Sequence, residues 1–490
     1  MTSVLQIFRW VHRGRGTARA TGIYLFSKLF TKGLAFLLIP VWTGVFAPSE
    51  YGIIGTLVAW AGVLSPLVLL GLPSALVRLR TDCRTENEWH TLVTSVSLVI
   101  LSVGILFLLS GLIVGPPIWE LIHSGGIPFW PYVPLAIAGI FVSSMGRVGL
   151  AVQQANQKPG WAIFYEQLLG LGTLFLALIF VVILHGGVVG YQIGGLLGGL
   201  ICSLAFVNEI RKFRADTLFD PSKLKLALAF GIPMIPQALA AWVLGLSDRV
   251  MVERFSGLTQ AGLYNLAANF GIMISMVAIS INQAVLPSYM QRAKDRFENQ
   301  EARCAALRQV VIRGFIVLAG VFVMAAAAGP LVLGWMVNAR YLEALPLLVP
   351  ILGGCFFFGI GQFLMLPLLF QRKTKLVAAV AVIGAGVNVA LNLHFIPDYG
   401  AIAAAYTTLG SYALTCILSY FFSRRSDWFG MGIGELLAIC GGASLSLVIC
   451  LYFDGPNLSD LIWRFVFNGI LVIGFSLWLW NLTIARNKTA

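Results

Sequence analysis

Two lysines in the first long apolar segment have the residue type and spacing that could bind an anion inside a membrane. Lys28 and Lys32 are four residues apart, so both lie on one face of a helix. Counted from residue 20, they lie about 12 and 18 Å along the helix axis. A lysine at that depth is costly unless it meets water, a counter-charge or a ligand. The pair therefore predicts an anion site; the alternative is that the side chains reach back to the inner surface.

Uncharged polar residues inside the apolar segments extend this candidate site. Two of them share the helix face of the lysines, and four others lie on the seventh and eighth apolar segments. Hydrogen bonding between helices is the alternative role for such side chains. The residues that we expect along the path of a polar ligand are Tyr24, Thr31, Gln237, Asn265, Asn269 and Gln283.

Four further charged residues lie within or at the ends of apolar segments. Arg147 and Glu166 are each about one turn and a half from an inner helix end, so they could pair with one another. Arg147 is also a third candidate for the anion site. Asp248 and Arg249 lie near an outer end, where we expect a gate or a carboxylate that couples transport to an ion; ordinary solvation at the surface is the alternative. Glu166 is a further candidate for the gate or the ion-coupling carboxylate. Whether that ion is H⁺ or Na⁺ stays open.

The composition requires these residues to be carried by membrane-spanning helices. The chain has 490 residues, of which 58% are apolar and 11% charged. Soluble domains are about 25% charged, so a soluble enzyme is excluded. We expect an all-α integral membrane protein with fourteen spans, near 21–46, 51–77, 91–115, 131–152, 161–184, 187–209, 224–250, 261–288, 307–333, 344–370, 376–396, 400–423, 431–453 and 461–484.

The basic residues sort onto alternate loops of this arrangement. Of the 33 Lys and Arg residues, 26 lie in the two tails and the loops on the same side, and four lie on the other side. Cytoplasmic loops concentrate Lys and Arg, so both termini are expected in the cytoplasm. The net charge of +13 is explained by this topology and does not indicate a nucleic-acid partner.

A weak internal repeat divides the expected spans into two halves. Gly52 and Gly262 are 210 residues apart, and each stands at the turn before an apolar segment. The repeat predicts two six-helix lobes around a central cavity. The expected divisions are a basic tail at 1–20, an N-lobe at 21–209, a linker at 210–223, a C-lobe at 224–423 and an extra helix pair with a tail at 424–490.

Signatures of metal sites and enzymes are not found in the sequence. Its seven Cys form no CxxC pair, and its five His have no metal-ligand spacing. Neither GxSxG nor a Walker loop nor HExxH occurs. We therefore expect a transporter with no cofactor and no bound metal.

Several motifs, taken in order, resemble the polysaccharide transporter family of flippases, the Wzx-like members of the MOP exporter superfamily. They are LIPVWTGVFAPSEYG (38–52), GLPSALVR (71–78), GIPMIPQALAAWVLGLSDRVMVERFSGLTQAGLYNLA (231–267), AVLPSY (284–289) and DYGAIAAAY (398–406). The resemblance implies a MATE-like fold with a V-shaped cavity. It also implies an undecaprenyl-pyrophosphate-linked oligosaccharide as cargo, a bacterial inner membrane as location, and polysaccharide polymerase machinery as a possible neighbour.

The candidate residues suit a cargo of that chemistry. A pyrophosphate with about two negative charges would be attracted to Lys28, Lys32 and Arg147. A multidrug antiporter of the MATE type is the alternative, but cationic drugs require buried carboxylates, and Glu166 is the one candidate in the membrane part of the first lobe. A membrane enzyme of glycan assembly is a weaker alternative, because it would be expected to carry a sizeable outer loop.

Overall fold

The computed structural model of the chain describes residues 17–123, 126–213, 217–294 and 300–425, with short stretches between 434 and 474. The described residues are helical and contain no strand. Ten of their helices are long and apolar enough to cross a membrane, as the composition predicted. The chain is therefore a multi-pass membrane protein. Most of the last two expected spans, 431–453 and 461–484, lies outside the described residues.

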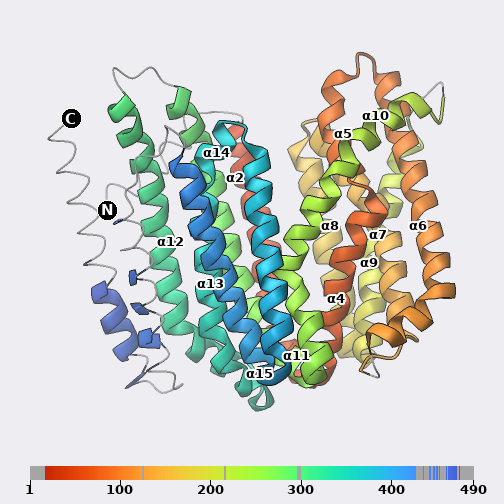
Figure 1. Ribbon diagram of the computed structural model, residues 1–490. Helices are drawn as coiled ribbons and strands as arrows, with labels where there is room; N and C mark the ends of the chain where they lie inside the picture. Colours follow the sequence, from red (N-terminus) through yellow and green to blue (C-terminus); the bar gives the residue numbers. More distant parts are fainter. Residues whose placement is uncertain are drawn as a thin grey trace. The chain divides into compact units, whose positions relative to one another are not determined.

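The helices follow one another with short connections (Figure 1). Their order is α2 (Thr17–Leu37), α3 (Ile39–Val45), α4 (Pro48–Leu69), α5 (Leu72–Leu79), η1 (Arg80–Asp82), α6 (Glu86–Ile122), α7 (Tyr132–Ala155), α8 (Pro159–Leu178), η2 (Ile179–Ile183), α9 (Gly187–Ile210), α10 (Pro221–Gly231), η3 (Ile232–Met234), α11 (Ile235–Lys294), α12 (Gln300–Met336), η4 (Ala339–Ala344), α13 (Leu345–Leu364), α14 (Leu366–Phe370) and α15 (Thr374–Arg424).

Two of these helices are each a pair of helices joined at one glycine. Gly257 interrupts the 60-residue α11 with φ 83°, and Gly400 interrupts the 51-residue α15 with φ 65°. Positive φ is the conformation that glycine adopts without steric cost. At 1.5 Å per residue, α11 would be about 90 Å long, roughly three membrane thicknesses. The breaks agree with the turns expected between spans seven and eight and between spans eleven and twelve; the total of fourteen stays a prediction.

The described residues form two compact units whose limits fall within or beside broken helices. Unit 1 takes its residues from Met1–Leu38 and Thr56–Trp242, and unit 2 from Ile39–Gly55 and Val243–Ala490. The first span is thus divided where α2 ends and α3 begins. These units differ from the expected lobes in two segments, which local contacts explain.

The segment that contains α3 belongs to unit 2 because η4 binds the end of α3. The Arg340 guanidinium donates hydrogen bonds to the carbonyl oxygens of Thr43 and Gly44 at 3.0 and 2.9 Å. The hydroxyl of Tyr341, which is fully buried, donates to the carbonyl oxygen of Phe46 at 3.0 Å. Cations near the C-terminus of a helix also satisfy its last carbonyl groups. These bonds tie α3 to the connection between α12 and α13.

The segment from α10 to Trp242 belongs to unit 1 because α10 packs against α5. A Cβ placed on Gly71 would lie 2.2 Å from the carbonyl oxygen of Gly231, so the two backbones meet directly. Further along, the Trp242 indole donates to the carbonyl oxygen of Ala59 at 2.6 Å. The chain passes from α10 into α11 through η3, where Pro233 and the nearby Pro236 interrupt the regular helical hydrogen bonds.

The core of unit 1 is a bundle of α6, α7, α8 and α9, and α5 packs against α7 with its buried side chains in the same core (Figure 1). Trp89 of α6 and Phe206 of α9 are both almost completely buried in this core. Side chains of this size contribute most to packing in a helical core. In unit 2, α13 packs against both α12 and α15.

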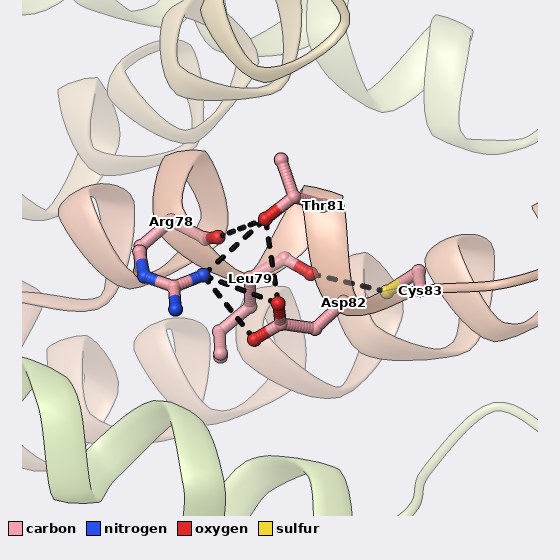
Figure 2. Close-up of polar contacts among 5 residues, drawn as sticks. All are labelled: Arg78, Leu79, Thr81, Asp82 and Cys83. Atoms are coloured by element: carbon pink, nitrogen blue, oxygen red, sulfur yellow. Dashed lines mark hydrogen bonds and ion pairs between the residues drawn. The ribbon is translucent and has the colours of Figure 1, made fainter.

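The connection between α5 and α6 is held by contacts among its own residues (Figure 2). The Arg78 guanidinium donates to both carboxylate oxygens of Asp82 at 3.2 and 3.3 Å and to the Thr81 hydroxyl at 3.3 Å. The Thr81 hydroxyl donates to the carbonyl oxygen of Arg78 at 3.1 Å, and the Cys83 thiol to that of Leu79 at 3.5 Å. Arg78 is thus engaged in local structure.

Candidate functional site

Lys28 forms an ion pair within unit 1. Its Nζ lies 3.8 Å from Oε1 of Glu166, which α8 carries. The two side chains keep 38% and 22% of their surface exposed. Both side chains are thus partly exposed. The sequence predicted both residues as functional, but it suggested Arg147 as the partner of Glu166, and that pair stays a prediction.

The helix face beside Lys28 is fastened to α8 by one glutamine. The Gln167 amide nitrogen donates to the carbonyl oxygen of Ser27 at 3.0 Å and also to the Ser27 hydroxyl. The Gln167 amide oxygen accepts from the Thr31 hydroxyl at 2.5 Å. Thr31, expected along the ligand path, is thus placed in a contact between helices. Sequence reasoning missed Gln167, because spacing along α8 does not show which helix lies opposite.

The other basic residues of the expected anion site also lie in unit 1. Lys32, one turn beyond Lys28 on α2, has an exposed side chain, and so does Arg147 on α7. The side chain of Tyr24 lies outside the described part of the chain. Three cationic side chains of one unit, on two helices, are thus accessible at least in part.

Gln237 lies in unit 1 at the start of α11, directly after the break at η3, and is exposed. Gln283 is exposed as well, near the end of the described part of α11. Both residues keep the accessibility that a ligand path requires. Their contact with a ligand stays a prediction.

Two amides expected along the ligand path instead contact the start of α4. The side-chain nitrogen of Asn265 lies 3.4 Å from the carbonyl oxygen of Tyr51. That of Asn269 donates to the Tyr51 hydroxyl at 2.9 Å. Asn265 is buried, and both bonds lie within unit 2. The structure places these residues in the helix-to-helix bonding that was the alternative interpretation.

Asp248 lies at the centre of a buried polar cluster in unit 2, where only 3% of its surface is exposed. Its Oδ2 accepts hydrogen bonds from the hydroxyls of Tyr264 at 2.7 Å and Thr408 at 2.6 Å. Its Oδ1 accepts from the amide of Asn392 at 2.7 Å. Three uncharged donors from three helical segments therefore surround one carboxylate. A buried polar network of this kind holds its members in one geometry.

The cluster continues along α15. The Asn392 amide also donates to Oδ1 of Asn388 at 3.1 Å, and its own oxygen accepts from the Thr407 hydroxyl. Both asparagines are completely buried. Their i, i+4 spacing was visible in the sequence, but the threonines on the second half of α15 gave no comparable signal. Gly400 brings the two halves of α15 together, which makes this arrangement possible.

Arg249, next to Asp248, is buried with 4% of its surface exposed. Within the described residues its Nε and Nη2 atoms have no hydrogen-bond partner. An unsatisfied buried donor costs free energy, so its role is unlike that of a solvated surface arginine. The structure therefore places both Asp248 and Arg249 inside the protein interior, where a charge needs a specific partner.

No group of three His, Cys, Asp or Glu residues in the described part of the chain is arranged to hold a metal ion.

Comparison with known sequences shows which protein family the chain matches. The model of the family described as polysaccharide biosynthesis protein matches residues 17–294. The chain is 25% identical over 366 residues to the succinoglycan biosynthesis transport protein ExoT of Rhizobium meliloti, which covers 70% of this chain and 69% of that protein. It is also 21% identical over 421 residues to the uncharacterized membrane protein MJ1068 of Methanocaldococcus jannaschii, covering 82% and 83%.

Solved structures show the same fold. The lipid II flippase MurJ in an inward closed conformation superposes with a TM-score of 0.71 and 17% identity, covering 95% of this chain and 99% of that one. An inward-facing MATE-family multidrug resistance transporter of the MOP superfamily has a TM-score of 0.62 and 15% identity, covering 80% and 94%. The chain therefore has the fold of these transporters, as expected.

Proposed function

Because this chain belongs to the polysaccharide biosynthesis protein family, a family of MOP-superfamily flippases, we propose that it carries an undecaprenyl-pyrophosphate-linked oligosaccharide across a bacterial inner membrane. The observation that supports this most is that three cations of unit 1, Lys28, Lys32 and Arg147, are at least partly exposed. A sugar-linked pyrophosphate carries about two negative charges and several acceptor oxygens, which ammonium and guanidinium groups bind through charge-assisted hydrogen bonds.

The balance of charge favours an anionic cargo over a cationic drug. On the α2 and α8 face, Glu166 is already within ion-pair distance of Lys28. A cation approaching this face would meet an excess of positive charge, whereas an anion would be attracted. The head group is therefore proposed to bind at unit 1, and the cargo to cross by alternating exposure to the two sides.

Coupling to an ion is proposed for unit 2. Asp248 is a buried carboxylate whose oxygens accept hydrogen bonds from the hydroxyls of Tyr264 and Thr408 and from the amide nitrogen of Asn392. Hard cations prefer oxygen ligands, and a buried carboxylate can also take up a proton. Binding of H⁺ or Na⁺ at Asp248 would neutralise the buried charge and so favour one conformation of the transporter.

The orientation follows from the basic loops. Both termini are proposed to lie in the cytoplasm, where the cargo is loaded, and the polysaccharide polymerase machinery would receive the cargo on the opposite side.

Complementation of a strain that lacks its own flippase tests the proposal. We expect the Lys28→Ala, Lys32→Ala double variant to reduce polysaccharide export at least about tenfold, since two charge-assisted contacts are lost. Lys158→Ala, which removes an exposed charge at the start of α8, is the matched control and should export at the parental rate. Immunoblots of membranes establish equal insertion.

Parental export by an inserted double variant would contradict the assignment of the head group to these lysines. Export of a cationic dye that is driven by a proton gradient and lost in Glu166→Gln would instead favour a multidrug antiporter.

A further inference from the structure

The contact between Lys28 and Glu166 has the geometry of an exchangeable ion pair. The 3.8 Å separation is long for a charge-assisted hydrogen bond, which has its optimum near 2.8 Å. Both side chains are partly exposed, and ion pairs in that setting contribute little to stability. The pair can therefore separate without disturbing the fold.

The helices that carry this pair are fixed around it. Gln167, the neighbour of Glu166, bonds Ser27 and Thr31, which flank Lys28 on α2. One turn further on α8, a Cβ on Gly170 would lie 2.8 Å from the methyl group of Thr31. The two backbones are thus held in register by contacts on both sides of the ion pair.

A phosphate group and the Glu166 carboxylate are both anions that can bind one ammonium group. A ligand that takes Lys28 must displace the carboxylate, and a carboxylate that returns to Lys28 must displace the ligand. This competition weakens binding of the ligand phosphate to Lys28. It also aids release of the ligand, because the Glu166 carboxylate is close enough to replace it as the partner of Lys28.

We propose that Glu166 is an internal counter-anion that occupies Lys28 in the empty transporter and competes the cargo pyrophosphate off that lysine at release. This inference rests on the proposed function. It assigns to Glu166 a role in release of the head group, so its removal improves binding while it slows transport.

Direct binding measurements on purified full-length protein in detergent test the proposal. The probe is a short-chain prenyl pyrophosphate diester of N-acetylglucosamine. Glu166→Gln is expected to lower the Kd by roughly two- to fivefold, the range that loss of one exposed ion pair allows. The same variant should export polysaccharide more slowly than the parent. Glu166→Asp keeps the charge on a shorter side chain and should fall between the parent and Glu166→Gln in both assays.

A second measurement separates competition for Lys28 from simple repulsion between two anions. In a Lys28→Ala background, Glu166→Gln should leave the Kd unchanged, because the carboxylate no longer has that ammonium group to occupy. An equal tightening in both backgrounds would mean a general field effect and would overturn the proposal. Glu209→Gln is the matched control, since this unit 1 carboxylate accepts hydrogen bonds from Gln153 and Tyr165 at 2.7 and 2.8 Å.

The outcomes distinguish this inference from the proposed function. A parent protein that binds the probe, together with a Glu166→Gln variant whose Kd and export rate are both parental, overturns the counter-anion role alone. A folded parent protein that does not bind the probe overturns both the head-group site and the counter-anion role. If Glu166→Gln does not fold, Glu166→Ala provides the same charge removal for the same two readouts.

Discussion

Gly52 of α4 and Gly262 of α11 lie against one another's helix backbone within unit 2. A Cβ on Gly52 would lie 2.1 Å from the carbonyl oxygen of Leu258, and one on Gly262 would lie 1.8 Å from that of Pro48. Such contacts are possible only when both residues lack a side chain. The two glycines that mark the internal repeat in the sequence are therefore also residues at which the two repeated turns contact each other directly.

The first prediction concerns this crossing. Gly262→Ala should destabilise the protein by about 1–3 kcal/mol, the usual cost of forcing an extra carbon into a packed contact. Thermal unfolding in detergent measures the change. Gly245→Ala is the matched control on the same helix, because a Cβ there meets nothing within 4 Å and alanine favours a helix. Equal stability of the two variants would contradict the close crossing.

A second prediction tests how α2 is held at the proposed anion site. Gln167→Leu removes the bonds to Ser27 and Thr31, so we expect a loss of about 1–3 kcal/mol in stability together with weaker transport. Gln192→Leu is the comparison, since it removes the hydrogen bond from the Gln192 amide to the carbonyl oxygen of Tyr132 at 2.8 Å. A smaller loss for Gln167→Leu than for Gln192→Leu would count against the fastening role of Gln167.

Local chemistry could be predicted from the sequence where one residue decides it. Gly257 and Gly400 stand between apolar segments, and glycine is the residue that accepts the backbone turn found at both. The four-residue spacing of Lys28 and Lys32 likewise defines a helix face without any tertiary information.

Partners across helices could not be predicted in the same way. Asp248 stands near the end of an apolar segment, which suggested an outer position, but its burial depends on Asn392 and Thr408 more than 140 residues later. The role of Gln167 was not predicted, because a lone glutamine in an apolar segment does not indicate which helix it faces. Side-chain periodicity reports a face, whereas the opposite helix is determined by packing of the whole unit.

A third prediction concerns the N-terminus of α10, where Asp220 caps the helix. Its Oδ1 accepts from the Ser222 hydroxyl at 2.6 Å and from the backbone nitrogens of Ser222 and Lys223 at 2.9 and 3.3 Å. The hydrogen bond from the Ser222 hydroxyl is the main reason that the pKa of Asp220 is lowered, and the two backbone bonds lower it further. Asp220→Ala should cost about 1 kcal/mol at pH 7, which thermal unfolding in detergent measures.

The pH dependence of this cap follows from the direction of the shift. Because the folded pKa of Asp220 is lowered, the stabilisation is present above the ordinary carboxyl pKa and is lost as the pH falls through the folded value. The difference between the parent and Asp220→Ala should therefore shrink in acid. Asp220→Asn, which can still cap the helix, should stay closer to the parent at pH 7. A difference that grows in acid would contradict the ionised cap.

The last prediction separates coupling from cargo binding. Asp248→Asn removes the negative charge but keeps the size of the side chain. The variant therefore no longer has a buried carboxylate that can alternate between an ion-bound and an empty state. We expect transport in proteoliposomes to lose its dependence on a gradient of H⁺ or Na⁺, while the Kd for a prenyl pyrophosphate diester stays parental, since Asp248 belongs to unit 2 and Lys28 to unit 1. Thr408→Val, which removes one hydrogen bond of 2.6 Å and leaves the carboxylate, should weaken the ion dependence without abolishing it. If transport by Asp248→Asn still depends on the gradient, the role of the carboxylate is in stability alone. Its three hydrogen-bond donors would then serve only to fix α11 against α15.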